Sequence, residues 1–377
     1  MRIIFVSTSV GPLGSGIGGG VELTLRTLAT GLVRAGHSVT VLAPMGSVLA
    51  STGSVVAPTD SALSALDTVG SAIHMVEVDG ALHVPSQTLG RATPLVVPQN
   101  SVLENMWQRA LELARTGDFD VVLNFAYDVQ PFVEASECAI PVAHLVSMGS
   151  LSDEMDSAVD AALENRPGSI AMHSRAQAQT FGSETAQRAI IVGSGIAVDE
   201  YDFSPTFTED VAFVGRISRE KGIDDVFAVS AMSGRQVRAF GVMEDRTVWD
   251  AAAEKFPEAR VHYEGFLPTN QLQRKLGMCA ALIMVHRWME AFGNVAIEAM
   301  ACGVPVITYD RGGPAEIVRD GVTGFVVPPD DLRAVVDALG RIGSIQRQQC
   351  RALVAEQYSE RAFAGRVAAW LGSLVRQ

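Results

Sequence analysis

Two glutamates, Glu290 and Glu298, are separated by seven residues in the segment EAFGNVAIEAMACGVPVI, residues 290–307. The segment predicts a helix over residues 292–301, so that Glu290 precedes the helix and Glu298 lies in its second turn. Carboxylates accept hydrogen bonds from hydroxyl groups, and the unpaired amides at a helix start favour an anion. A ligand that has hydroxyl groups on either side of a phosphate would fit these two carboxylates and the amides between them, and a sugar nucleotide is such a ligand. The alternatives are an exposed helical glutamate for Glu298 and a helix-start preference for Glu290.

A second group of charges follows the apolar run 211–215, in the sequence GRISREKG of residues 215–222. Arg216 and Lys221 lie there on a loop that leads into the next helix. The loop lacks the GK[ST] of a Walker motif. Two cations at the carboxyl end of a strand match a diphosphate in charge. The alternative is a solvated turn.

A glycine-rich loop, GSGIGG at residues 14–19, lies between an expected strand and an expected helix and has the GxGxxG pattern of dinucleotide-binding proteins. It departs from that fingerprint, because its first glycine comes seven residues after Ser7 and the next strand ends without an acidic residue for a ribose. Glycines 18–20 still let backbone amides approach a phosphate at a helix start. A nicotinamide or flavin enzyme, and a flexible surface loop, are the alternatives.

These loops require strands and helices that alternate along the chain. Continuous apolar strands between amphipathic helices predict parallel sheets covered on both faces. Helices are expected near residues 101–116, 175–182 and 359–376. The expected strands are residues 3–7, 38–44, 74–78, 120–125, 141–146, 169–174, 189–195, 211–215, 236–241, 260–265, 280–285, 304–309 and 324–328.

The length of 377 residues favours two domains over one. The polar segment 199–210 is the expected linker between a first domain, residues 1–198, and a second, residues 211–358, with residues 359–377 as a final helix. Residues 46–70 are expected to form a surface excursion. Open doubly wound sheets bind ligands at the carboxyl ends of their strands, so two such domains facing each other predict a central cleft.

The composition narrows the classes of partner. The net charge of −13 opposes general attraction to nucleic acid or to anionic lipid. The four cysteines are far apart in the sequence and are expected to be reduced, buried thiols without metal-ligand spacing. The amino terminus lacks the features of a signal peptide, and no stretch of eighteen apolar residues occurs. A cytoplasmic protein is expected.

The segment 290–307, followed by GGPAEIVRDGVTGFVVPP at residues 312–329, resembles the signature of the family-four retaining glycosyltransferases of GT-B fold. Other matching motifs occur in order along nearly the whole chain. They are GGGVE at 18–22, GDFDVVLNF at 117–125, PVAHLV at 141–146, GIAVDEYDF at 195–203, FVGRISREKGI at 213–223 and GFLP at 265–268. The resemblance implies two Rossmann-like domains, with the final helix crossing back towards the first.

The resemblance also implies roles for individual residues. Glu298 would accept the ribose hydroxyls, and Glu290 would meet the hydroxyls of the transferred sugar. The catalytic residues would be Glu290, His144, Arg216 and Lys221, with His144 at a strand end near the reacting carbon. The donor-binding residues would be Gly19, Gly20, Arg216, Lys221, Phe266, Leu267, Glu290, Ala291, Phe292, Gly293, Asn294 and Glu298.

The implied reaction moves a hexose, glucose first, from a nucleoside-diphosphate sugar with uridine favoured as the base. Fixed cations and helix-terminal amides would stabilise the departing diphosphate. No metal and no cofactor are expected, since the sugar nucleotide is a co-substrate and Asp120, in the DFD of residues 118–120, is expected to open a strand. The acceptor is expected to be a soluble small molecule or saccharide, bound on first-domain loops around residues 45–105 and 147–168, without membrane association.

The chain departs from the family pattern at His286-Arg287-Trp288-Met289, where Pro-Ser is common, and His286 or Arg287 is expected to shape donor or acceptor choice. Two other functions remain open. One is a sugar-nucleotide epimerase of GT-B architecture, and the other is a non-catalytic protein that binds nucleotide sugars. A glycosidase with two carboxylates would need both acids beside the scissile bond.

Overall fold

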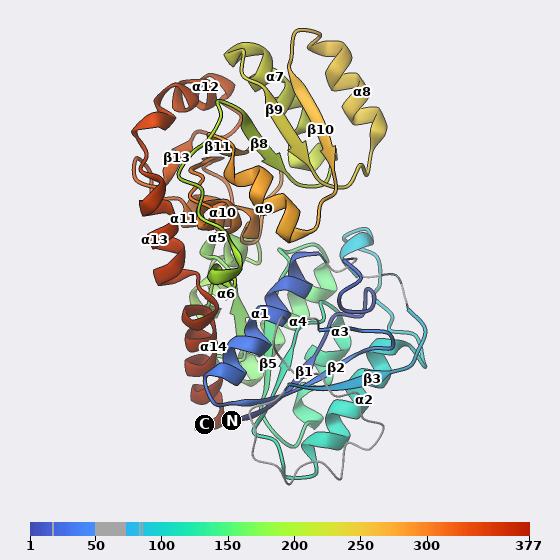
Figure 1. Cartoon of the computed structure of the whole chain (residues 1–377). Helices are drawn as coiled ribbons and strands as arrows, with labels where there is room; N and C mark the ends of the chain where they lie inside the picture. Colours follow the sequence, from blue (N-terminus) through green and yellow to red (C-terminus); the bar gives the residue numbers. More distant parts are fainter. Residues whose placement is uncertain (17–18, 50–72, 83, 85) are drawn as a thin grey trace. The chain divides into compact units, whose positions relative to one another are not determined.

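The computed structural model describes residues 1–16, 19–49, 73–82, 84 and 86–377, and it divides into two compact units (Figure 1). The first unit combines Met1–Gly195 with Glu360–Gln377, and the second is Ile196–Ser359. Gly18 and most of the expected surface excursion, residues 50–70, lie outside the described residues. Each unit is described by itself below.

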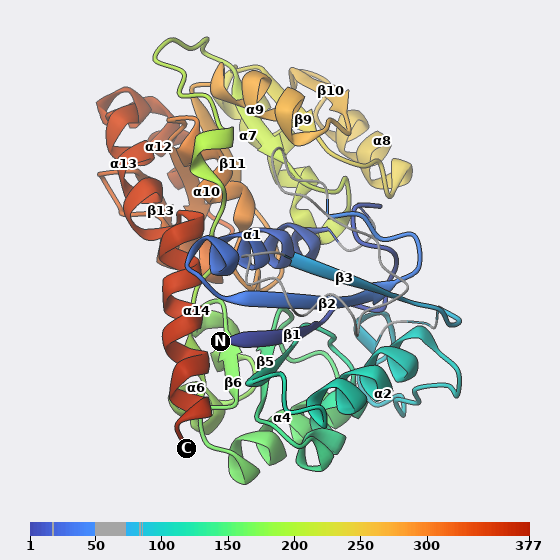
Figure 2. The same ribbon diagram turned by 60° about the horizontal axis from the view of Figure 1, so that its bottom comes forward.

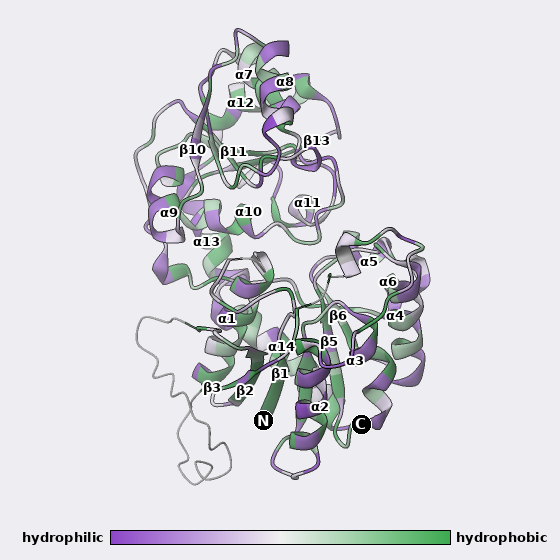
Figure 3. Ribbon diagram, turned by 90° about the vertical axis from the view of Figure 1, so that its right-hand side faces the viewer, coloured by the Kyte–Doolittle hydropathy of each residue, from purple (hydrophilic) through white to green (hydrophobic). Residues whose placement is uncertain are grey.

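The first unit is built on a seven-stranded parallel sheet with the strand order β3-β2-β1-β4-β5-β6-β7. Its five inner strands are nearly all buried, as expected of a parallel sheet covered on both faces, whereas the edge strands β3 and β7 are less buried. The strands are β1 (Arg2–Val6), β2 (Ser38–Pro44), β3 (Ile73–Val78), β4 (Val121–Asn124), β5 (Val142–Val146), β6 (Ile170–Met172) and β7 (Ile190–Ile191). In Figure 3, β1 carries the hydrophobic colour, whereas α2 mixes hydrophilic and hydrophobic residues.

The helices of this unit begin at residues that cap them. Ser101 and Ser152 each accept a hydrogen bond from the amide three residues ahead, at the starts of α2 and α4. The helices are α1 (Gly20–Arg34), α2 (Val102–Ala114), α3 (Val129–Val133), α4 (Asp153–Asn165), α5 (Arg175–Gln179), α6 (Ser183–Arg188) and α14 (Glu360–Val375). Helix α4 corrects the expectation that residues 147–168 form loops.

The final helix, α14, lies beside α1 in the first unit (Figures 1 and 2). The two helices approach closely at Gly31, where an added Cβ would stand 2.8 Å from the Cβ of Ala364. Phe363 and Trp370 of α14 are buried in the same core cluster as β1 and β2. A salt bridge of 2.6 Å joins Arg34 Nη1 to Glu360 Oε1. The last helix therefore packs into the core of the unit that contains the amino terminus.

The second unit is built on a six-stranded parallel sheet with the order β10-β9-β8-β11-β12-β13. Its strands are β8 (Val211–Val214), β9 (Val237–Phe240), β10 (Val261–Gly265), β11 (Ala281–Met284), β12 (Val306–Tyr309) and β13 (Gly324–Val327). Its helices are α7 (Ile223–Ser233), α8 (Arg246–Lys255), α9 (Thr269–Gly277), α10 (Asn294–Ala301), α11 (Gly313–Ile317), α12 (Leu332–Arg341) and α13 (Arg347–Gln357). A short 3-10 turn, η4 (Arg219–Lys221), precedes α7.

The expected linker, residues 199–210, belongs to the second unit. Its residues bond to that unit: the Asp202 amide donates to Gln273 Oε1 and the Ser204 amide donates to the carbonyl of Cys302. Tyr201 is 4% exposed. Polar composition and a proline predicted a linker, but tertiary hydrogen bonds and a buried aromatic ring hold the segment in place.

Candidate functional site

Strands β8 and β11 are parallel neighbours in one sheet. The loops that follow these two strands therefore lie against each other. Gly222, with φ 77°, makes this approach possible, because an added Cβ would stand 2.0 Å from the carbonyl oxygen of Val285. A backbone hydrogen bond of 2.8 Å from the Arg287 amide to the carbonyl of Glu220 joins the two loops. The sequence Glu220-Lys221-Gly222 is thus held beside the residues that lead to Glu290.

Lys221 and Glu290, predicted from separate motifs, meet at this junction. Lys221 Nζ lies 2.6 Å from Glu290 Oε2. The same oxygen accepts a hydrogen bond of 3.1 Å from Trp288 Nε1. The Lys221 ammonium also lies 4.7 Å from the centre of the Trp288 ring, within the range of a cation–π contact. One carboxylate oxygen therefore receives two donors, and Lys221 has two partners.

The charge of Glu290 follows from these neighbours. Burial alone would raise the pKa of Glu290, but the adjacent Lys221 ammonium, with help from the Trp288 N–H, brings the pKa below its ordinary value. The side chains of Lys221 and Glu290 are 20% and 18% exposed, so both are largely withdrawn from water while still accessible. Glu290 is a carboxylate at neutral pH. An ionised carboxylate at this position can accept hydrogen bonds from sugar hydroxyls.

Glu298 has a different environment on the second turn of α10. Tyr201 Oη donates to Glu298 Oε1 at 3.2 Å. Burial raises the pKa of Glu298, and the hydrogen bond from Tyr201 offsets only part of that rise. The pKa values of the two glutamates are therefore shifted in opposite directions. The contact also gives Tyr201, from the expected linker, a place at the site.

The backbone from Glu290 to Gly293 packs against two glycines that follow β12. An added Cβ on Gly312 would stand 2.6 Å from the carbonyl oxygen of Glu290, and one on Gly313 would stand 2.5 Å from Cα of Phe292. The Gly313 amide donates to the carbonyl of Glu290 at 2.8 Å. The pair of glycines therefore fixes the loop from which Glu290 projects.

Helix α10 begins at Asn294, two residues later than predicted, because Gly293 adopts a left-handed conformation with φ 93° as its N-cap. Ala291 and Phe292 lie in the loop just before it. The Phe292 ring is 7% exposed and packs edge-on against Tyr358, with ring centres 5.8 Å apart. The backbone, rather than the side chain, of Phe292 is therefore the part that could face a ligand.

Arg216 lies at the carboxyl end of β8, where it was predicted, but it is already paired. Its Nη1 contacts both oxygens of Glu244 at 2.7 and 2.8 Å, and its Nη2 contacts Glu220 Oε1 at 2.8 Å. The side chains of Arg216 and Glu244 are both 47% exposed. Exposed ion pairs of this kind contribute little, so a diphosphate could displace the Glu244 carboxylate.

Phe266 and Leu267 follow β10 at the edge of the same sheet. The Phe266 side chain is 66% exposed, which is unusual for a large aromatic residue. Because β9 and β8 separate β10 from β11, the loops bearing Phe266 and Glu290 lie three strand spacings apart, or about 14 Å. An extended sugar nucleotide has this order of length.

His144 belongs to the first unit and its position differs from the expected strand end. It is the third of five residues in β5 and is 1% exposed. Its ring stacks on Phe132 with centres 4.1 Å apart, and Nδ1 lies 3.3 Å from Asn124 Nδ2. Burial lowers the pKa of His144 to about 3, so the imidazole is neutral. Ser147 is the residue that follows the end of β5; its hydroxyl lies 3.4 Å from His173 Nε2.

Gly19 and Gly20 lie at the start of α1, also in the first unit. Gly19 is the N-cap, with φ 55°, and its amide donates to the carbonyl of Gly16 at 3.2 Å. Glu22 Oε2 accepts from the amides of Gly14 and Gly16. In this conformation the amides of Gly14, Gly16 and Gly19 donate hydrogen bonds within the loop. The contact of the loop with phosphates therefore stays a prediction.

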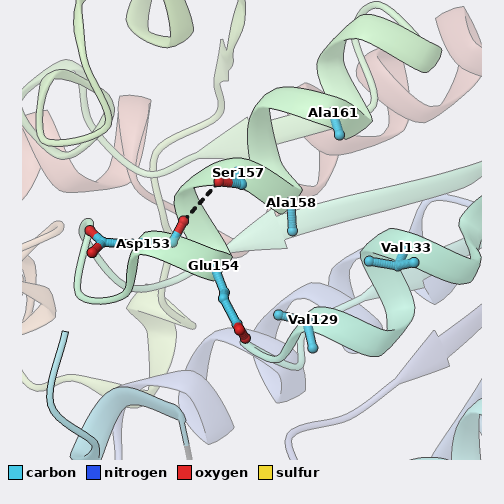
Figure 4. Close-up of a pocket in the computed structure, with 7 residues that line it drawn as sticks. All are labelled: Val129, Val133, Asp153, Glu154, Ser157, Ala158 and Ala161. Atoms are coloured by element: carbon cyan, nitrogen blue, oxygen red, sulfur yellow. Dashed lines mark hydrogen bonds between the residues drawn. The ribbon is translucent and has the colours of Figure 1, made fainter. Parts of the chain in front are cut away.

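Two other features of the first unit include none of the predicted donor residues. Asp118 and Asp120 both contact Arg2 at the amino ends of β1 and β4, and β4 begins one residue after Asp120. A hollow of about 500 Å³ is lined by residues of α3 and α4, and Figure 4 shows the Ser157 hydroxyl bonded to the carbonyl of Asp153 there. Its lining residues are Val129, Val133, Asp153, Glu154, Ser157, Ala158 and Ala161.

The departures at residues 286–288 have separate roles. His286 is 3% exposed and its Nε2 bonds to the carbonyl of Arg311 at 2.8 Å. Arg287 pairs with Asp225 of α7 at 2.7 Å. The sequence alone predicted no partner for Trp288. Of the three residues, Trp288 is the one that contacts the Lys221–Glu290 pair.

Among the described residues, no three His, Cys, Asp or Glu side chains form a group that could hold a metal ion. No helix in this part of the chain has the length and apolar character needed to cross a membrane.

Known proteins are similar to this chain in sequence and in fold. Residues 202–363 match the family described as Glycosyl transferases group 1. An uncharacterized 41.2 kDa protein in the cps region of Klebsiella pneumoniae is 33% identical over 34% of this chain and 36% of its own length. A D-inositol 3-phosphate glycosyltransferase of Nocardia farcinica is 35% identical over 35% of this chain and 32% of its own length. The matches thus span about a third of these two curated relatives.

Solved structures extend the likeness to the whole chain. AviGT4, a glycosyltransferase involved in avilamycin A biosynthesis, has a TM-score of 0.69 at 18% identity and covers 100% of this chain and 98% of its own. Anabaena Alr3699/HepE in complex with UDP has a TM-score of 0.70 at 18% identity, over 99% of this chain and 100% of its own. These likenesses confirm the predicted fold. Residues 202–363 therefore belong to the group 1 glycosyl transferases, within a chain of GT-B fold.

Proposed function

We propose that this chain is a retaining glycosyltransferase that moves a hexose, glucose first, from a uridine-diphosphate sugar to a soluble saccharide or small-molecule acceptor without a metal ion. The observation that carries the proposal is the meeting of Lys221 with Glu290 at the carboxyl ends of β8 and β11. A cation for phosphate and an ionised acceptor of hydroxyl hydrogen bonds lie side by side there.

The donor would lie along the carboxyl ends of the strands of the second unit. The base would lie near Phe266 and Leu267 after β10, and the diphosphate near the loop after β8 with Arg216 and Lys221. The sugar would lie near Glu290 after β11. The strand order β10-β9-β8-β11 supports this arrangement, because the loops proposed to bind the base, the diphosphate and the sugar follow β10, β8 and β11 in that order along the sheet. Glu298 would accept the ribose hydroxyls beside Tyr201.

The chemistry is the departure of a diphosphate from the anomeric carbon. Negative charge develops on the leaving oxygen, and the fixed Lys221 ammonium, the Arg216 guanidinium and the amides before α10 would stabilise it. These groups supply positive charge without a metal. In front-face attack, the departing phosphate oxygen would take the acceptor's proton, so no side chain need act as the base.

The names of similar proteins support the choice of donor and of acceptor. Solved structures of Anabaena Alr3699/HepE contain UDP, UDP with glucose, and UDP-glucose. Several curated relatives are D-inositol 3-phosphate glycosyltransferases, and one is a 2-deoxystreptamine N-acetyl-D-glucosaminyltransferase of Niallia circulans. Their names point to small polar acceptors, which is the class we propose for this chain.

Thermal denaturation with nucleoside diphosphates tests the donor. A ligand that binds only the folded state raises the melting temperature, by a free energy of about 2.7 kcal/mol at a hundredfold excess over its dissociation constant. We expect uridine diphosphate to raise the melting temperature more than guanosine or adenosine diphosphate, with and without a chelator. No shift with any of the three would refute the donor class. Release of a free sugar epimer from the donor without acceptor would instead indicate an epimerase.

A further inference from the structure

Trp288 is the least expected member of the Lys221–Glu290 cluster. It lies two residues before Glu290 in the loop between β11 and α10, and it is partly buried. The other three tryptophans, Trp107, Trp249 and Trp370, are at most 9% exposed and lie in hydrophobic surroundings. Trp288 instead contacts two charged groups, which calls for an explanation other than core packing.

The indole contacts both members of the ion pair through different parts of the ring system. Its N–H donates to Glu290 Oε2 at 3.1 Å, and its ring faces the Lys221 ammonium at 4.7 Å. Lys221 Nζ reaches the same Oε2 at 2.6 Å. Each of the three side chains therefore contacts the other two.

This arrangement limits where the two charges can lie. A lysine has a flexible four-carbon stem, and an ammonium at one end of it is easily redirected. A ring on one side and a carboxylate oxygen on another restrict the ammonium of Lys221, while its third hydrogen stays available to a phosphate. Both donors engage Oε2 of Glu290, and no described residue donates to Oε1, so that oxygen can accept from a sugar hydroxyl.

Neighbouring residues of the loop do not share this role. Arg287 contacts Asp224 and Asp225 of α7, and His286 is bonded to the carbonyl of Arg311. We propose that Trp288 is a positioning residue, which holds the Lys221 ammonium and the Glu290 carboxylate in the geometry that receives the diphosphate and the sugar; the role in binding rests on the function proposed above.

Calorimetric titration of the full chain with uridine diphosphate, and with guanosine and adenosine diphosphate in parallel, tests the proposal. Trp288→Phe keeps a ring but removes the N–H, whereas Trp288→Leu removes both. We expect the dissociation constant of the tightest nucleotide to rise about threefold in the first variant and about tenfold in the second. Trp249→Phe is the matched control, because Trp249 contacts only the rings of Phe227 and Tyr263 among the aromatic residues described. It should bind as the wild type does.

The Lys221→Gln background separates positioning from direct contact. If Trp288 acts through Lys221, its substitution should change the dissociation constant by less than about twofold when Lys221 is already absent. An equal loss of nucleotide affinity in the wild-type and Lys221→Gln backgrounds would mean that the indole contacts the nucleotide itself. That result would overturn the proposal. Wild-type affinity in Trp288→Leu would overturn it as well.

A measurement without ligand separates failure of this inference from failure of the proposed function. Melting temperatures of Lys221→Gln, Trp288→Leu and the double variant form a cycle that needs no nucleotide. We expect the melting temperature of the double variant to fall by less than the sum of the decreases in the two single variants. Additive losses would overturn the positioning role. If the wild type bound none of the three nucleotides, the proposed donor would fail, and this cycle would decide alone whether the indole holds the pair.

Discussion

Replacing Lys221 by methionine removes one charge and little volume, and it leaves the Glu290 carboxylate without its counter-ion. At a separation of about 4 Å and an effective dielectric constant of about 20, a pair of unit charges gains about 4 kcal/mol. The observed separation is 2.6 Å, but the side chains are 20% and 18% exposed, and desolvation offsets part of this gain. We expect Lys221→Met to lower the free energy of unfolding by about 2 kcal/mol.

For a unit the size of Ile196–Ser359, a change of about 2 kcal/mol corresponds to a loss of about 4–8 °C in melting temperature. Circular dichroism on heating at about pH 7 measures it. Lys275→Met is the matched control, since Lys275 also pairs with a glutamate of this unit, Glu264, but Glu264 retains Arg238 as a second partner. We expect a smaller loss in the control.

The pH dependence has a defined sign. In the wild type the pKa of Glu290 is below its ordinary value of 4.5, so its ion pair stabilises the fold above that pH and the stabilisation is lost as the pH falls through the lowered pKa. In Lys221→Met, burial raises the pKa instead, and protonation on acidification relieves the buried charge. The difference between the two proteins should therefore be largest at about pH 7 and shrink at about pH 4.

The rescue by a second substitution is the sharpest part of this prediction. Glu290→Gln in the Lys221→Met background removes the unpaired charge, so the double variant should melt higher than Lys221→Met at about pH 7. Equal losses in Lys221→Met and Lys275→Met, or a double variant less stable than Lys221→Met, would refute the reasoning.

Three further outcomes follow from the same site. Glu298→Gln should erase the preference for uridine diphosphate over its 2′-deoxy analogue in calorimetry, because an amide nitrogen, a donor, replaces one of the two oxygens predicted to bond the ribose hydroxyls; an unchanged preference would contradict the role. Glu244→Gln should tighten nucleotide binding about twofold to fivefold, because Arg216 loses a competing exposed carboxylate, whereas weaker binding would argue against competition. Gly222→Ala should lower the melting temperature by more than Gly234→Ala, which has a similar φ of 68° but nothing within 4 Å of its added Cβ; equal losses would refute the close approach.

The sequence predicted the elements well where periodicity was strong. The strand over residues 38–44 has the same limits in the structure, and the final helix differs by one residue at each end from the expected 359–376. The strand expected over residues 189–195 is reduced to Ile190–Ile191 at the sheet edge, where fewer neighbours support pairing. Apolar character alone does not specify how many residues an edge strand pairs.

Helix α4 was missed although its signals are present. Ser152 is an N-cap, acidic residues occupy the first turn, and Met155, Val159 and Leu163 recur every four residues on a buried face. The start of α10 was misplaced for another reason. Gly293 is left-handed at a position where an added Cβ would stand 2.6 Å from Cγ of Pro314, and the sequence around residue 293 does not reveal such a distant neighbour.

The site could be predicted as a set of residue types but not as a set of contacts. Lys221 and Glu290 are 69 positions apart, and the order of the strands in the sheet is what brings them together. Trp288 and Glu244 were not predicted, because a lone indole and an exposed glutamate have no distinctive spacing. His144 was placed at a strand end from its motif, whereas the pleat of β5 directs its ring into the core.

The central claim, that Lys221 receives the diphosphate, can be measured directly because the chain has only three lysines, at positions 221, 255 and 275. Labelling with ¹³C-lysine leaves their ammonium groups unchanged and gives each a separate Cε–H signal in NMR spectra, and Lys221→Gln identifies one of them. On titration with uridine diphosphate, the Lys221 signal should shift with occupancy while those of Lys255 and Lys275 stay in place. A Lys221 signal that does not move at a concentration shown by calorimetry to saturate the protein would contradict the account.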